Sequence, residues 1–288
     1  MIRRFSLLTA VALGLVVTGI GGVSPAQAAK RPVVNMAAVG AAAHTEPQLG
    51  NRKALGDDAS TKRIQRALNA KGFRTPVNGR YGAATTKAYA KFQRSLGYRG
   101  MNANGIPGRS SLARLGAGRF TVVNRVVVGS RNDRYGNARV NTRTALMLAA
   151  ADRRLPWKLR VSQGSYCTLT RRGCAGESAG THDGGGAVDI RASGLSPTAR
   201  WRTVEALRRV GFAAWLRTPS QCGGCWPYHI HAIAIGDADV WQRNGGRDNR
   251  DQVADYYRGR NGLANHARDN TPRAYRVPFT WWEKYSRG

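Results

Sequence analysis

Residues 181–190 read THDGGGAVDI, and residues 228–235 read YHIHAIAI. These two segments contain three of the five histidines of the chain. Three consecutive glycines let the backbone fold sharply, so that His182 and Asp189 can reach one point. The second segment predicts a strand, in which residues two apart such as His229 and His231 share a face. The histidines are therefore concentrated where a site can form.

Two imidazoles and the carboxylate of Asp189 make a three-ligand set for zinc. A fourth position is then left for water, which is typical of catalytic rather than structural zinc sites. Bound zinc lowers the pKa of water toward ~7 and polarises a carbonyl group under attack. The alternative is structural: His182 caps a glycine loop, Asp189 ends a strand, and the paired histidines are partly exposed sheet residues.

Residues 182–189 fit the pattern H-x-x-G-x-A-x-D, with Gly185 and Ala187 in place. Over residues 120–288 the chain resembles the zinc D-alanyl-D-alanine carboxypeptidase and L-alanyl-D-glutamate endopeptidase family. The resemblance implies an α+β domain whose antiparallel sheet carries the metal. It also implies that the ligands are His182, Asp189 and His231, and that His229 occupies a position where some members stabilise the oxyanion.

The general base is not assigned by this resemblance. Members of the family place an acid three residues before the last ligand, where this chain has Tyr228, whose ordinary pKa near 10 makes it a poor base. Zinc endopeptidases similar to lysostaphin use an H-x-H strand in which the first histidine assists the water, which favours His229. Asp183 and Glu177 are the second choices, and two further acids remain candidates, Asp237 and Asp239.

A clamp for a substrate carboxylate is also not evident. The family carries an arginine after a strand end similar to S-G-Y, whereas this chain has Tyr166 and Cys167 there. The arginines that could substitute are Arg160, Arg171 and Arg172.

Elements on both sides of these motifs predict mixed helix and strand. Asn141 is a candidate cap for a helix to about Arg154, and Ser196 with Pro197 begins a second helix that Gly211 ends. Strands are expected at residues 122–128, 158–163, 212–216 and 229–235.

Helical spacing predicts a separate three-helix unit at residues 55–117. Ile64 and Leu68 are four apart, a second segment repeats apolar residues through Phe92, and a short third segment follows Pro107. This order resembles the peptidoglycan-binding domain of secreted wall hydrolases. Asn78 and Asn104 stand where that family often has Asp, and Asn serves the same turn role.

The chain of 288 residues is strongly basic, with 46 Lys and Arg against 16 Asp and Glu, a formal charge of +30. Residues 59–132 contain fifteen Lys or Arg and no acid. This field favours peptidoglycan carboxylates and anionic wall polymers such as teichoic acids as partners. Nucleic acid is the rival, but no nucleic-acid motif accompanies the charge. A solvated basic surface is the structural alternative.

Residues 1–28 predict a signal peptide: Arg3 and Arg4 precede an apolar run, and Ala26-Gln27-Ala28 is a cleavage signal. A membrane anchor is the alternative, and no other segment is long and apolar enough to span a bilayer. The mature protein is therefore expected outside the cytoplasm or associated with the wall. Residues 29–54 predict a linker with little order.

The four cysteines fit an exported chain, in which an even number indicates two disulfides. Their connectivity is open among Cys167, Cys174, Cys222 and Cys225, and a four-thiolate zinc site is the alternative.

Together these features predict a small all-α three-helix module followed by an α+β domain with an antiparallel sheet carrying a metal site. The expected function is that of an exported cell-wall peptidase, which binds peptidoglycan and hydrolyses a stem or cross-link peptide bond with zinc-activated water. The alternative is a non-catalytic peptidoglycan-binding protein with a degenerate peptidase domain.

Overall fold

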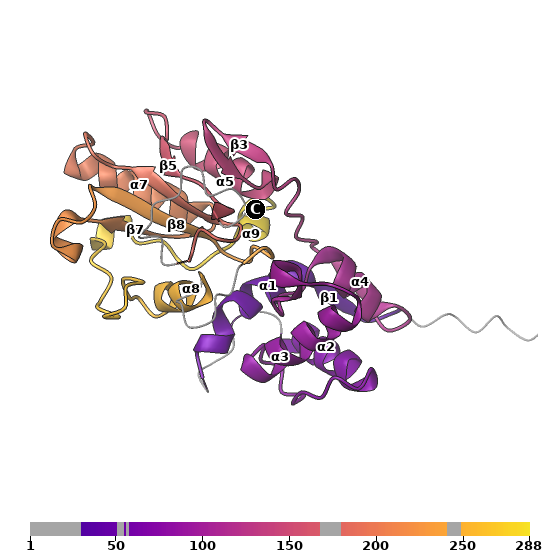
Figure 1. Cartoon of the computed structure of the whole chain (residues 1–288). Coiled ribbons are helices and arrows are strands. Elements are labelled where there is room, and N and C mark those ends of the chain that lie inside the picture. The colour runs from indigo at the N-terminus through magenta and orange to yellow at the C-terminus, as the bar shows by residue number, and fades with distance from the viewer. Residues whose placement is uncertain (1–29, 51–54, 56–57, 168–179, 241–248) are drawn as a thin grey trace, which may run out of the picture. The chain divides into compact units, whose positions relative to one another are not determined.

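The computed structural model describes residues 30–50, 55, 58–167, 180–240 and 249–288. The predicted signal peptide lies outside these residues. Residues Arg31–Gly288 form one compact unit (Figure 1).

The predicted three-helix unit is present as α2 (Asp58–Ala70), α3 (Ala83–Ser95) and α4 (Arg109–Gly116), with a 3-10 turn η2 (Gly100–Ala103) before α4. Each helix buries its apolar face in one core, in which Ile64, Phe92 and Leu112 are fully or almost fully buried. The helical spacing in the sequence therefore indicated these elements correctly.

Gln65 holds the turn between α2 and α3. Its amide nitrogen donates to Asn78 Oδ1 at 3.0 Å and to Arg80 O at 2.8 Å, and its oxygen accepts from the backbone N–H groups of Asn78 and Gly79. Asn78 Oδ1 also accepts from the N–H of Arg80, the side-chain turn expected for this position.

The side chain of Asn104 stabilises a turn and also makes hydrogen bonds to the α+β segment. Its oxygen accepts from the N–H of Ile106, as in the turn at Asn78, but its amide nitrogen donates to the carbonyl oxygens of Ala238 at 3.0 Å and Val240 at 2.8 Å. A carboxylate at this position cannot donate these bonds. The amide thus joins the three-helix segment to the α+β segment.

The expectation of little order at residues 29–54 was wrong for the described part of that range. Residues Met36–Thr45 form helix α1, which is buried along its whole length and is capped by Asn35, and a 3-10 turn η1 (Glu46–Gln48) follows it. A helix that is apolar on all sides has no polar face, so its sequence lacks the periodicity by which surface helices are recognised. His44, at its end, accepts from the N–H of Gly236 at 2.9 Å.

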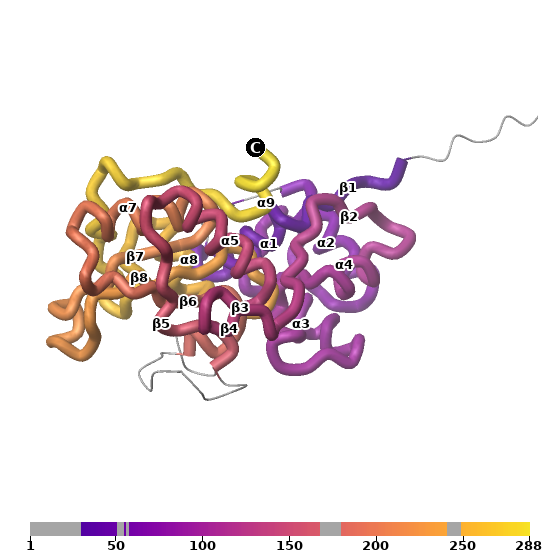
Figure 2. The backbone as a smooth tube through the Cα atoms, turned by 90° about the horizontal axis from the view of Figure 1, so that it is seen from above, coloured from indigo at the N-terminus to yellow at the C-terminus, as the bar shows by residue number. Residues whose placement is uncertain are grey.

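The α+β segment is built on a four-stranded antiparallel sheet. Its strands are β5 (Val161–Gln163), β6 (Ala187–Arg191), β7 (Phe212–Arg217) and β8 (His229–Ala234), in the order β5-β6-β8-β7 (Figure 2). Strands β7 and β8 follow the predicted ranges closely, whereas β6 lies outside the ranges predicted as strands. The predicted strand at 158–163 is present only over Val161–Gln163.

Different helices cover the two faces of the sheet. On one face, α5 (Thr142–Asp152) and α7 (Pro197–Arg209) pack on alternate strand residues that include Ile190 and Ile230. On the other face, α8 (Asn249–Tyr257) packs on the remaining residues, which include Trp215 and Ile233 (Figure 1). The N-caps of α5 and α7 are the predicted Asn141 and Ser196. Strand alternation therefore decides which side chains face α8.

Short elements complete the fold. Strand β2 (Thr121–Val123) pairs in parallel with β1 (Val33–Asn35), and β3 (Asp133–Tyr135) pairs with β4 (Ala138–Val140). The other short elements are the 3-10 turns η3 (Pro219–Cys222) and η4 (Arg273–Tyr275) and the short helix α9 (Trp282–Tyr285). The strand predicted at 122–128 was wrong beyond Val123, because Asn124 has a φ of 50° and turns the chain out of extended geometry. Within the part of the chain that the structure describes, no helix is long and apolar enough to cross a bilayer.

Replacing Asn104 by Asp tests the joint between the segments. Asn104→Asp removes two donors and leaves the carbonyl oxygens of Ala238 and Val240 facing a carboxylate, so the free energy of unfolding is expected to fall by about 1–3 kcal/mol. Urea denaturation followed by circular dichroism measures the change.

Asn78→Asp is the matched control, because Asn78 accepts its hydrogen bonds from Gln65 and Arg80 through Oδ1, and Asp retains this oxygen. Equal losses of stability in the two variants would show that the Asn104 amide does not stabilise the joint.

Candidate metal centre

The pairing of β6 with β8 places Asp189 opposite His231. These two residues are direct partners in the antiparallel register, and His231 is also the partner of Trp215 on β7. The same alternation places His229 and Arg217 on this face of the sheet, the face covered by α8.

His182 reaches the same point through the glycine turn, which is held on two sides. The N–H of Cys167 donates to His182 O, the N–H of Tyr166 donates to Gly184 O, and the N–H of Gly185 donates to Asp239 O, at 2.8–2.9 Å. The turn therefore fixes where His182 enters the site.

Two of the three glycines are required by close contacts. A Cβ on Gly185 would lie 2.6 Å from Tyr166 Oη, 2.8 Å from Asp239 Cβ and 2.9 Å from Asn141 Nδ2. Gly186 has a φ of 86°, and a Cβ there would lie 2.9 Å from Asp237 Cβ. The sequence pattern G-G-G thus reflects a cradle that admits only hydrogen at these α-carbons.

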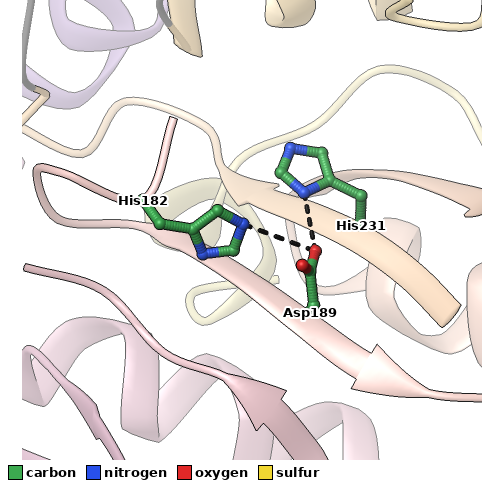
Figure 3. Close-up of side chains that lie close together, drawn as sticks. All are labelled: His182, Asp189 and His231. Atoms are coloured by element: carbon green, nitrogen blue, oxygen red, sulfur yellow. Dashed lines mark hydrogen bonds and ion pairs between the residues drawn. The ribbon is translucent and has the colours of Figure 1, made fainter. Parts of the chain in front are cut away.

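The three predicted ligands converge (Figure 3). One donor atom from each of His182, Asp189 and His231 lies within 4.8 Å of the other two. Asp189 Oδ1 is 2.8 Å from His231 Nδ1 and 3.4 Å from His182 Nε2, and both histidines are buried. The residue types and spacing are those of a possible metal-binding triad.

Each imidazole is oriented by a second hydrogen bond. His182 Nδ1 donates to Gly164 O at 2.8 Å, which leaves its Nε2 directed at Asp189. His231 Nε2 lies 2.8 Å from Gln252 Oε1, an acceptor supplied by α8. The Nδ1 of His231 is then the atom directed at Asp189.

Asp189 carries the negative charge of the triad. Burial alone would raise the pKa of Asp189, but the charge and hydrogen bond of His182, together with the hydrogen bond of His231, hold it well below its usual range. Burial lowers the pKa of His231, and the charges of His182 and Arg217 add to this against the effect of Asp189. Asp189 is therefore ionised and His231 favours its neutral form at neutral pH.

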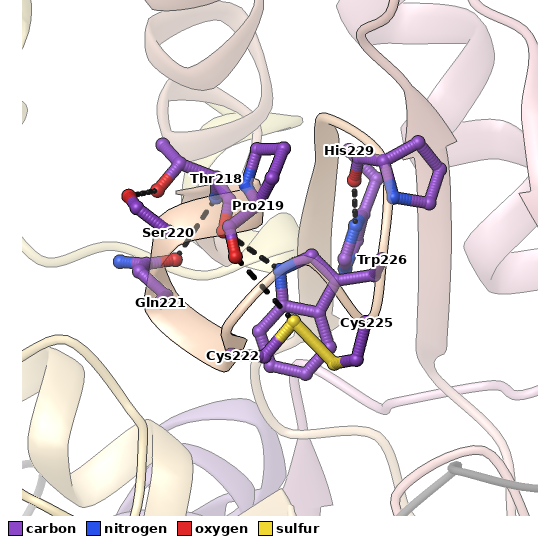
Figure 4. The surroundings of a disulfide bond; sticks show 9 residues. Thr218, Pro219, Ser220, Gln221, Cys222, Cys225, Trp226 and His229 are labelled. Carbon is purple, nitrogen blue, oxygen red and sulfur yellow. Dashed lines mark hydrogen bonds between the residues drawn. A yellow bond between two sulfur atoms is a disulfide. The ribbon is translucent and has the colours of Figure 1, made fainter.

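His229 lies two residues from His231 at the edge of this face. Its Nδ1 donates to Pro227 O at 2.9 Å, which places the proton on Nδ1 and the lone pair on Nε2. The ring packs edge-on against Trp226, whose Nε1 donates to Thr218 O at 2.9 Å (Figure 4). His229 is thus held by the loop that connects β7 to β8.

The same loop contains the disulfide between Cys222 and Cys225 (Figure 4). Cys167 is also disulfide-bonded, whereas Cys174 lies outside the described residues. The alternative of a four-thiolate zinc site is excluded for the three described cysteines, because none of them is a free thiol.

The other candidate bases lie in different places. Tyr228 belongs to the opposite face, where it packs on the core beneath α7 and the guanidinium of Arg200 lies 3.7 Å from its ring centroid. Asp183 is buried next to His182. Burial lowers the pKa of that histidine, but Asp189, the hydrogen bond to Gly164 and the charge of Asp183 together raise it above its ordinary value. Glu177 lies outside the described residues. The structure therefore turns Tyr228 away from the triad.

Asp237 and Asp239 support the glycine turn instead of pointing to the triad. Asp239 accepts from Tyr166 Oη at 2.7 Å and from two nitrogens of Arg131 at 2.7 Å. Asp237 accepts from Asn141 at 2.8 Å, and burial with the nearby charge of Asp239 raises its pKa to about 6.

Two residues near the triad were missed by sequence reasoning. Gln252 lies on α8, which starts 18 residues after His231, and nothing in its own sequence marks it. Arg217 could have been placed on the face of residues 213 and 215 by strand alternation, but its position beside His229 follows only from the register of β7 and β8. Of the clamp candidates, Arg160 is exposed, and Arg171 and Arg172 lie outside the described residues.

Comparison with known families identifies the three-helix segment. Residues 57–115 match the family model described as a putative peptidoglycan binding domain. This match spans α2, α3 and all but the last residue of α4, and it confirms the resemblance of residues 55–117 to a peptidoglycan-binding domain. Compared with curated proteins, the whole chain shows no significant match. The resemblance of residues 120–288 to zinc peptidases stays a prediction.

Replacing Gly185 by Ala tests the cradle. The added methyl group meets Tyr166, Asp239 and Asn141 at 2.6–2.9 Å, so Gly185→Ala is expected to lower the free energy of unfolding by about 1–3 kcal/mol. Urea denaturation measures it.

The matched control is Gly40→Ala within α1. There the nearest atom to an added Cβ is Gly236 O at 3.5 Å, an ordinary contact, and Ala favours helix over Gly, so this variant should be neutral or more stable. If Gly185→Ala unfolded with the same free energy as the parent, the close packing around Gly185 would be contradicted.

Proposed function

We propose that this protein is an exported, wall-associated metallopeptidase that binds peptidoglycan and hydrolyses a peptide bond of its stem or cross-link. The observation that carries the proposal is the convergence of His182, Asp189 and His231 in a chain whose residues 57–115 match a peptidoglycan-binding family.

The donor set fits a divalent cation. Both nitrogens of His231 face acceptors, Asp189 Oδ1 and Gln252 Oε1, an arrangement that suits either a doubly protonated ring or a cation between Nδ1 and the carboxylate. Burial disfavours the doubly protonated ring, because it lowers the pKa of His231. Two imidazole nitrogens and one carboxylate oxygen are ligands that zinc accepts, so zinc is the proposed metal.

The chain's own residues have separate tasks in hydrolysis. His182, Asp189 and His231 would hold the zinc, and a bound zinc would activate water and polarise the scissile carbonyl. His229 accepts the proton of the attacking water at Nε2, since its Nδ1 proton is held by Pro227 O, and returns it to the leaving amine. The products are a carboxylate and an amine. Asp183 is the second candidate for this proton transfer.

Arg217 supplies positive charge on the same face as the triad. Its guanidinium donates to Asn261 O at 2.6 Å and lies 5.2 Å from the ring of Trp215. Although Arg217 is buried, its charge attracts a carboxylate of the peptidoglycan stem toward this face of the sheet.

One observation favours the alternative of a non-catalytic peptidoglycan-binding protein. The position that holds an acidic base in the related zinc peptidases is Tyr228 here, and it points to the opposite face of the sheet. If His229 does not replace that acid, the α+β segment keeps its metal ligands without activity. The following experiment separates the two functions.

Hydrolysis is tested by incubating the purified protein with peptidoglycan sacculi and counting newly released amines. Treatment with EDTA should abolish the release and added zinc should restore it. His231→Ala should lose both zinc and activity, whereas His229→Ala should keep zinc and lose activity by about 10²–10⁴-fold, the usual contribution of a general base.

Co-sedimentation with sacculi is the control and should be unchanged in both variants. Equal release of amines by metal-free protein would overturn the metal mechanism. Sedimentation of the parent protein with sacculi without any release would establish the non-catalytic alternative.

Gln252 is expected to tune metal affinity through His231. Gln252→Leu removes the acceptor for His231 Nε2 and should raise the zinc dissociation constant about 10–100-fold, as measured by competition with a chelating dye. Gln252→Glu retains an acceptor oxygen and should bind zinc at least as tightly as the parent. If both variants bind zinc as the parent does, Gln252 does not orient the ligand.

A further inference from the structure

A cavity lies apart from the triad, and none of the three predicted ligands lines it. Its volume is about 620 Å³, and it is formed by the end of α7, the end of α8 and residues 258–279. Trp215 stacks on His231 on one side and meets Tyr256, a wall of the cavity, edge-on at 5.9 Å on the other. The proposed hydrolysis makes no use of this cavity.

The lining is strongly cationic. Among the described residues it contains a single carboxylate, Asp269, and five arginines: Arg208, Arg258, Arg260, Arg268 and Arg276. Positive charge therefore exceeds negative charge around this open cavity. Such an excess favours an anionic ligand.

Part of the lining is paired internally. Arg208 is 2% exposed, donates to Asp269 at 2.8 Å, and also donates twice to Ala214 O. Asp269 in addition accepts from the N–H and hydroxyl of Thr271. Arg260 Nη1 and His266 Nδ1 lie 3.9 Å and 2.8 Å from carboxylate oxygens of the buried Asp255. Asp269 is thus already bonded, and Arg208 is a structural residue.

Two arginines at the opening remain available to a ligand. Arg268 and Arg276 are exposed, and no ion pair joins either of them to a carboxylate of the described residues. Arg276 is oriented by a bond from its Nε to Thr271 O at 3.0 Å, which leaves its two terminal nitrogens for other acceptors. Two guanidinium groups at one opening can each grip a phosphate through paired hydrogen bonds.

The remaining wall of the cavity is aromatic. Phe279 packs on Tyr256 and on Tyr257, with ring centroids 5.8 Å and 5.4 Å apart. Aromatic faces beside guanidinium groups suit a ligand that carries carbon-rich units between its charges. A phosphodiester chain of glycerol or sugar alcohol has this alternation, whereas a peptide stem carries only isolated carboxylates.

We propose that the arginine-lined cavity binds the phosphodiester backbone of an anionic wall polymer. The proposal rests on the charge and shape of the cavity and on the peptidoglycan-binding family match, which relates the chain to the wall. It does not depend on hydrolysis, so the cavity can fail its test while the peptidase passes, and the reverse.

Binding of the full chain to purified poly(glycerol phosphate), measured by isothermal titration calorimetry, tests the site. The double variant Arg268→Ala/Arg276→Ala should weaken binding at least tenfold, and Arg268→Lys/Arg276→Lys should fall between it and the parent, because charge remains but paired hydrogen bonds are lost. Amine release from polymer-free sacculi should be unchanged.

The control Arg273→Ala/Arg287→Ala removes the same charge from exposed residues that do not line the cavity, and should weaken binding less than twofold. Equal losses in the cavity and control variants would show that net charge alone attracts the polymer and would overturn the site. Competition by duplex DNA as effective as by the polymer itself would also overturn it, since the cavity would then not distinguish wall polymer from nucleic acid.

Discussion

The register between β6 and β8 is the constraint on which the candidate metal centre depends. It places Asp189 opposite His231, although 42 residues separate them in the sequence. A slip of one residue would turn either side chain to the face beneath α7. The register is held by the apolar partners of that face, such as Ile190 and Ile230, which are buried only in this pairing. The hydrophobic core therefore maintains the spacing of the polar site.

The second constraint is the support of the glycine turn, which carries His182. Asp237 and Asp239 are buried beneath this turn, and the bonds of Asp239 to Arg131 and Tyr166 keep its carboxylate in place. These acids therefore contribute to the site without facing the ligands. The pairing of β6 with β8 thus positions Asp189 and His231, and the buried polar network beneath the glycine turn positions His182.

Much of the fold could be predicted because local signals agreed with the tertiary structure. The caps Asn141 and Ser196, the helical spacing from Ile64 and the strand of His229 each appear where the sequence placed them. The three metal-ligand candidates also converge as expected. Helix α1 could not be recognised because it is apolar on all sides, and Gln252 could not because its role depends on how α8 packs on the sheet.

Adaptability differs sharply among the parts of this site. The turn at Gly185 and Gly186 accepts no side chain, so evolution has little freedom to vary the distance between His182 and Asp189. The loop closed by Cys222 and Cys225 meets the site at His229 and is half-exposed, so it can change in composition while the ligands stay fixed. New binding preferences in descendants of this chain would therefore arise first in that loop, with the triad inherited intact.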